Sequence, residues 1–145
     1  MSAVRHVGIT VTNLNESIRF YRDLLGFEIK KVMLESGECI DNFSNLQNTL
    51  VITIKMSAAP GSGTIELLNY VSHPSFTEDR STYPITDVGC SHFAITVENL
   101  DSLYETLKQE GIKFNYPVQT SPDGNVKIAF CRDPDGTLIE LVEDL

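Results

Sequence analysis

A short stretch of sequence occurs twice in this chain, and both copies carry the same types of polar residue. The segment His6–Val11 reads HVGITV and returns 86 residues later as HFAITV at His92–Val97. Similarly, IELL at Ile65–Leu68 returns 74 residues later as IELV at Ile139–Val142. Each copy therefore supplies one histidine and one glutamate on a strand-like segment. The repeat predicts two half-domains of similar structure.

The first copy has the pattern strand, helix, strand, strand, strand. Alternating apolar and polar residues rich in β-branched side chains predict the strands, which are 4–11, 27–32, 50–56 and 64–70. Asn13 offers a helix cap after the first strand, apolar residues then recur at three- and four-residue spacing up to Leu25, and Gly26 suits a left-handed terminator. Residues 36–48 are polar and irregular, so we expect a loop or a ragged strand edge there.

The second copy repeats this order after a polar linker at 71–87 that contains Pro74 and Pro84. An amphipathic helix is expected over residues 100–110, closed by Gly111. The predicted strands are 91–97, 112–118, 126–132 and 138–142. The chain is thus divided into module one (1–70), the linker (71–87) and module two (88–145).

Composition limits the kind of partner. The formal net charge of −9 argues against nucleic acid, whose phosphates need a basic surface, and no apolar run is long enough for a membrane span. The N-terminus lacks the layout of a signal peptide. The three cysteines, Cys39, Cys90 and Cys131, are odd in number and widely spaced, which predicts reduced thiols in a cytoplasmic protein.

The repeated polar residues are His6, Glu66, His92 and Glu140. Neutral imidazole and carboxylate both bind divalent ions, and a set of two histidines and two carboxylates suits an open octahedral site. A buried set of this kind is costly unless a cation neutralises the carboxylates. The neighbouring Ile65, Leu67, Ile139 and Leu141 alternate with the glutamates and are expected to point into apolar packing.

Each of these residues alone has an ordinary structural interpretation. A histidine at a strand start is more often hydrogen-bonded structure than a ligand, and a strand glutamate usually faces solvent. Recurrence at equivalent places in both copies is what favours a metal. Two acidic residues, Glu38 and Asp41, are second-choice candidates for a catalytic base, and their ordinary interpretation is that of solvent-exposed charges in a loop. His73 is interpreted as a linker residue.

At these residues the chain resembles the vicinal oxygen chelate superfamily, which includes glyoxalase I, methylmalonyl-CoA epimerase, extradiol dioxygenases and the fosfomycin and bleomycin resistance proteins. The resemblance covers nearly the whole chain and rests on the segments His6–Val11, Ser17–Phe27, Gly89–Ala94 and Phe130–Leu141. It implies an α+β fold in which two βαβββ modules form a curved, partly closed mixed sheet around a metal. It also assigns the four metal positions to His6, Glu66, His92 and Glu140.

The resemblance also points to branches within the superfamily. Bacterial glyoxalase I has the same His-Glu-His-Glu order, whereas the epimerases typically place Gln at the position of Glu66. Glyoxalase I enzymes carry an arginine four residues after the first metal histidine, to hold a carboxylate of glutathione, and Thr10 stands there in this chain. Ring-cleaving dioxygenases need only two histidines and one glutamate around iron.

The expected function is a glyoxalase-like, divalent-metal-dependent lyase or isomerase. Its small-molecule substrate would chelate the metal (Ni, Co, Zn, Mn or Fe) through vicinal oxygens, which would stabilise an enediolate or enolate. Glu66 or Glu140 would act as the base, and Tyr70, Phe76, Tyr83 and Phe130 are expected to line the substrate site. The alternatives are an epimerase-like racemase, an iron-dependent dioxygenase and a non-catalytic small-molecule (antibiotic) binding protein. Family analogy implies a homodimer, with the site built within one chain or across two.

Overall fold

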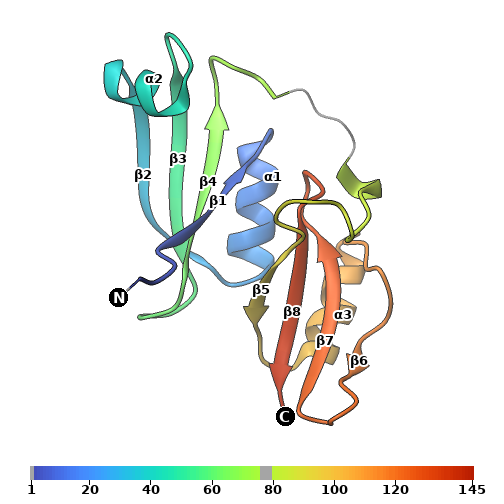
Figure 1. Ribbon diagram of the computed structural model, residues 1–145. Coiled ribbons are helices and arrows are strands. Elements are labelled where there is room, and N and C mark those ends of the chain that lie inside the picture. The colour runs from blue at the N-terminus through green and yellow to red at the C-terminus, as the bar shows by residue number, and fades with distance from the viewer. Residues whose placement is uncertain (1, 76–79) are drawn as a thin grey trace. The chain divides into compact units, whose positions relative to one another are not determined.

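The computed structural model describes residues 2–75 and 80–145 and divides the chain into two units, 1–77 and 78–145. Each unit contains one four-stranded mixed sheet with helices beside it (Figure 1). The α+β class is therefore confirmed, the two sheets have equivalent strand orders, and neither sheet closes into a barrel.

The sheet of the first unit has the strand order β1-β4-β3-β2. β1 (His6–Thr10) runs parallel to β4 (Thr64–Tyr70), whereas β3 (Leu50–Ser57) is antiparallel to both β4 and β2 (Glu28–Ser36). Apolar side chains on alternate positions form the core on one face of this sheet: Ile65 and Leu67 are 4% and 0% exposed. This is the packing that the alternation predicts.

The helix of the first unit begins and ends where the sequence predicts. Asn13 caps α1 (Leu14–Ile18), and its side-chain oxygen accepts hydrogen bonds from the backbone N–H groups of Asn15 and Glu16. The helix continues as the π-helical segment η1 (Arg19–Leu24), and Gly26, with φ of +78°, follows it. Phe20 and Tyr21 in η1 are fully buried and pack edge to face.

The expectation of a loop or ragged edge over 36–48 is wrong, because residues Glu38–Ser44 form a helix, α2. Gly37 adopts φ of +98° at its start and Asn45 a left-handed conformation at its end. Few apolar residues mark this helix, and Ile40 alone among them is buried. The Asp41 carboxylate accepts hydrogen bonds from the Asn48 and Thr49 N–H groups, so it holds the chain that follows.

The second unit repeats the strand order as β5-β8-β7-β6. β5 (Phe93–Thr96) is parallel to β8 (Leu138–Asp144), and β8 is antiparallel to β7 (Val126–Arg132). The predicted strand at 112–118 is wrong: Phe114 forms an isolated bridge to Cys131, and strand β6 covers only Gln119–Thr120. Pro117 lies in the segment and has no N–H group to donate to a neighbouring strand.

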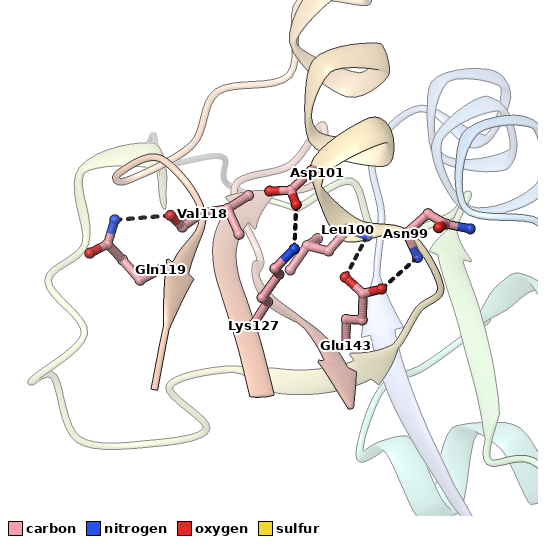
Figure 2. A network of polar contacts seen from close by, with 7 residues as sticks. All are labelled: Asn99, Leu100, Asp101, Val118, Gln119, Lys127 and Glu143. Carbon is pink, nitrogen blue, oxygen red and sulfur yellow. Dashed lines mark hydrogen bonds and ion pairs between the residues drawn. The ribbon is translucent and has the colours of Figure 1, made fainter. Parts of the chain in front are cut away.

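Helix α3 (Leu100–Gln109) is capped from a distant strand. Asn99 at its N-cap has φ of +53° and makes no side-chain capping bond. The carboxylate of Glu143, on β8, instead accepts hydrogen bonds from the N–H groups of Asn99 (3.1 Å) and Leu100 (3.0 Å), as Figure 2 shows. The same view shows Lys127 of β7 paired with Asp101 in the first turn of the helix.

The beginning of the second unit is tied to the turn between β7 and β8. The Arg132 guanidinium donates hydrogen bonds to the backbone carbonyls of Arg80, Tyr83 and Gly136. The short 3₁₀ helix η2 (Arg80–Thr82) thereby lies against this turn. Within the described residues, no helix has the length and apolar character needed to cross a membrane.

Candidate metal-ligand pairs

The first histidine and glutamate lie side by side on the sheet of the first unit. In the parallel register of β1 and β4, Gly8 is opposite Glu66 and His6 shares its face of the strand. The Nε2 atom of His6 is 3.3 Å from Oε2 of Glu66, and their side chains are 40% and 11% exposed. The pair therefore combines a largely buried carboxylate with an imidazole that still reaches solvent.

Glu66 has a second partner that the sequence reasoning missed. Lys55 lies directly opposite Glu66 in the antiparallel register of β3 and β4, and its Nζ is 2.8 Å from Oε1 of Glu66. Both carboxylate oxygens are thus engaged, one by imidazole and one by ammonium. The predicted strands 50–56 and 64–70, paired end to end, would place Lys55 opposite Ile65; the observed register is shifted by one residue and brings Lys55 opposite Glu66.

The second histidine and glutamate form an equivalent pair in the second unit. His92 stands one residue before β5, and Glu140 lies opposite Ala94 in the parallel register of β5 and β8. The Nε2 atom of His92 is 3.2 Å from Oε2 of Glu140. Ser91 Oγ lies 2.8 Å from the other ring nitrogen, Nδ1, and so helps to fix the imidazole orientation.

The position of Lys55 is taken by an aromatic residue in the second unit. Phe130 lies opposite Glu140 in the register of β7 and β8. Its ring meets the His92 ring edge to face, with the centroids 5.2 Å apart. The two pairs therefore share their histidine and glutamate but differ in the third residue, which is a cation in one unit and an apolar ring in the other.

The spacing of each pair fits adjacent ligands of a divalent ion. Two donors bound at about 2.1 Å and at right angles lie about 3.0 Å apart, close to the 3.3 and 3.2 Å separations found here. Neutral imidazole and carboxylate also suit such an ion chemically. In the described part of the chain, no three His, Cys, Asp or Glu side chains gather as a metal-binding group. Each unit by itself therefore holds two candidate ligands.

The predicted wall residues have different surroundings. Tyr70 ends β4, two alternations along the same face from Glu66, and is half-buried. Tyr83 lies in the segment that follows η2, and its ring lies beneath the Arg80 guanidinium at 4.7 Å. Phe130 contacts His92, as described above, and Phe76 lies outside the described residues.

Three other titratable side chains, Asp41, His73 and Cys131, lie outside the two histidine–glutamate pairs. Hydrogen bonds from Thr49 and Asn48 lower the pKa of Asp41, consistent with a carboxylate that braces the α2 loop. His73 is in a loop, where Nδ1 lies 2.8 Å from Ser72 Oγ. Cys131 is buried, and desolvation together with the nearby Asp133 raises the pKa of its thiol to about 12.

The chain is similar to known proteins over nearly its whole length. The Arabidopsis thaliana lactoylglutathione lyase GLX1 is 28% identical over 138 residues, which are 95% of this chain but only 43% of that protein. A 2-epi-5-epi-valiolone epimerase from Actinomyces is 25% identical over 147 residues, covering 97% of this chain and 78% of the epimerase. A crystal structure of a glyoxalase family protein from Bacillus cereus superposes with a TM-score of 0.89 at 23% identity, and the match covers 100% of this chain and 95% of that one.

A family model, Glyoxalase/Bleomycin resistance protein/Dioxygenase superfamily, also matches the chain. It extends over residues 3–141 and so includes all four repeated histidine and glutamate positions. The chain belongs to the glyoxalase/bleomycin resistance protein/dioxygenase superfamily.

Proposed function

We propose that the protein is a divalent-metal-dependent lyase or isomerase that removes a proton from carbon next to a carbonyl group. The main support for this proposal is the equal spacing of the two histidine–glutamate pairs. The distance from Nε2 to Oε2 is 3.3 Å for His6–Glu66 and 3.2 Å for His92–Glu140. In this proposal the two pairs supply four ligands to one cation, either within one chain or across a homodimer. When bound, the cation supplies Lewis-acid stabilisation of the negative charge that develops on the carbonyl oxygen.

Within this proposal, Glu140 is the better candidate for the base. Glu66 has both oxygens engaged, by His6 and Lys55, and its side chain is 11% exposed. Glu140 pairs only with His92 among the described residues, through Oε2, and its side chain is 19% exposed. A base must reach the proton of the substrate. Oε1 of Glu140 has no hydrogen-bond or ion-pair partner among the described residues, whereas both oxygens of Glu66 have one.

The surroundings of Glu140 support a small substrate with an apolar part. Phe130 packs against the His92 imidazole and lies opposite Glu140 on the neighbouring strand, so an apolar ring stands beside the pair. The relatives named lactoylglutathione lyase and 2-epi-5-epi-valiolone epimerase are consistent with a lyase or an isomerase. The proton-exchange assay with candidate substrates identifies which substrate is used.

Metal binding is tested first, by calorimetric titration of metal-free protein with Zn²⁺ and Ni²⁺. Loss of an outer partner of a ligand typically costs about 10–100-fold in affinity, so Glu66→Gln and Glu140→Gln should each weaken binding at least that much. Glu105→Gln is the matched control, because Glu105 is an exposed carboxylate on α3. Equal affinities for all four proteins would contradict the proposal.

Activity is tested second, by following proton exchange in D₂O by NMR under anaerobic conditions. The substrates are the methylglyoxal–glutathione hemithioacetal and pairs of acyl-CoA epimers. Exchange that requires metal and is lost in Glu140→Gln supports the lyase or isomerase. Turnover only with ferrous iron and O₂ would instead support a dioxygenase, and tight ligand binding by metal-free protein would support a binding protein.

A further inference from the structure

Four residues form one row across the whole sheet of the first unit. The register pairs Gly8 with Glu66, Glu66 with Lys55, and Lys55 with Lys31, in the strand order β1-β4-β3-β2. Residues directly opposite one another on neighbouring strands point to the same face of the sheet. Lys31 and Lys55 are therefore cross-strand neighbours on the face that carries Glu66.

Two ammonium groups in this position are unfavourable without a counter-ion. Like charges directly opposite each other on neighbouring strands destabilise a sheet. Lys55 is compensated by Glu66, at 2.8 Å. The Lys31 side chain is exposed and, within residues 2–75 and 80–145, its ammonium group has neither a hydrogen bond nor an ion pair. The row therefore carries one more positive charge than negative charge.

This local excess of positive charge is not a general property of the chain. The chain carries a net charge of −9, with 11 basic and 20 acidic residues. The adjacent Lys30, at the irregularity in the register of β2 and β3, is paired with Glu28. In the second unit the corresponding row reads Ala94, Glu140 and Phe130, so it holds an aromatic ring where the first unit has Lys55.

We propose that Lys31 and Lys55, called here the lysine pair, bind an anionic group of a small molecule, a carboxylate or a phosphate. Neighbouring strands are about 4.8 Å apart, so Lys31 lies two strands, or about 10 Å, from Glu66. A small anionic molecule held by the lysine pair would extend toward Glu66. Gly8, on the other side of Glu66, has no side chain to obstruct this face.

This inference rests on the proposed function only where it identifies that molecule as the substrate; anion binding itself needs no metal. Neutralisation of Glu66 by a bound cation would leave the charge of Lys55 uncompensated. Anion and cation binding should then strengthen each other, by the same factor in both directions.

The test is an NMR titration of metal-free protein with sodium sulfate and with sodium acetate, at constant ionic strength set with sodium chloride. The backbone amides of β2 and β3 around Lys31 and Lys55 should show saturable shifts with one of these anions. Stronger binding of sulfate assigns a phosphate-like group, and stronger binding of acetate assigns a carboxylate. Absence of saturable shifts with both anions would overturn the proposal.

The matched variants are Lys31→Met and Lys30→Met, which remove neighbouring lysines that differ in their partners. Because an exposed ammonium makes a charge-assisted but solvent-screened contact, Lys31→Met should weaken anion binding at least about fivefold. Lys30→Met should leave it unchanged. Equal weakening by both variants would show a general charge effect and overturn the site.

A melting-temperature comparison tests the charge repulsion, and the metal titration separates the lysine pair from the proposed function. In chloride alone, Lys31→Met should melt at a higher temperature than the wild type, because the variant removes like-charge repulsion; a lower melting temperature would contradict that reasoning. The metal titration described above is separate from these experiments. Failure of metal binding with anion binding intact would reject the proposed function alone, and the reverse result would reject the lysine pair alone.

Discussion

Removal of the Glu143 carboxylate should destabilise helix α3 although Glu143 lies outside the helix. Its two oxygens accept the N–H groups of Asn99 and Leu100 at 3.1 and 3.0 Å, and the Asn99 side chain makes no capping bond. Loss of a helix N-cap costs about 0.5–2 kcal/mol. Because two N–H groups lose their acceptor here and Leu100 is fully buried, we expect Glu143→Ala to cost about 2 kcal/mol, near the upper end of that range.

The assay is urea unfolding followed by far-ultraviolet circular dichroism. With an m value of about 2 kcal/mol per molar urea, a loss of about 2 kcal/mol lowers the unfolding midpoint by about 1 M. Glu143→Gln should lie between the wild type and Glu143→Ala, because its amide keeps one acceptor oxygen but no charge. Amide hydrogen exchange should accelerate most in the first turn of α3.

The control is Glu105→Ala, which removes an exposed carboxylate from the middle of the same helix and replaces it with a strong helix former. Its midpoint should stay within about 0.25 M of the wild type, since an exposed substitution usually changes stability by no more than about 0.5 kcal/mol. If Glu143→Ala and Glu105→Ala shift the midpoint equally, the capping argument is refuted.

Two other predictions follow from burial and close approach. In native protein at pH 8, Cys39 and Cys90 should react with iodoacetamide while Cys131 stays unmodified, because Cys131 is buried and the pKa of its thiol is raised to about 12. The labelling is measured by mass spectrometry. Labelling of Cys131 as fast as that of the other two cysteines would contradict this prediction. Gly136→Ala should cost more than about 2 kcal/mol in urea unfolding, because φ is +89° and the new Cβ would lie 2.8 Å from Ser81 N. Gly124→Ala, with φ of +76° and open space around it, should cost only about 1 kcal/mol, and equal losses would refute the role of the close contact.

Local features of the chain were readable from the sequence because they depend on neighbouring residues. Period-two alternation placed Ile65 and Leu67 in the core and Glu66 on the opposite face. Asn13 and Gly26 marked the ends of the first helix because their side-chain and backbone preferences act within a few residues. Short helix α2 was missed because it has few apolar residues to reveal its period, and the strand at 112–118 was predicted from alternation that Pro117 interrupts.

By itself, the sequence determined that two similar halves each carry a histidine at the start of the first strand and a glutamate on the last strand. The tertiary structure decided which distant residues contact one another: Lys55 lies beside Glu66, Phe130 lies beside His92, and Glu143 caps the start of α3. The physical reason is strand register, which joins residues that are far apart in the chain. A shift of one residue would turn every side chain of a strand to the other face, so these contacts exist only once the whole sheet has formed.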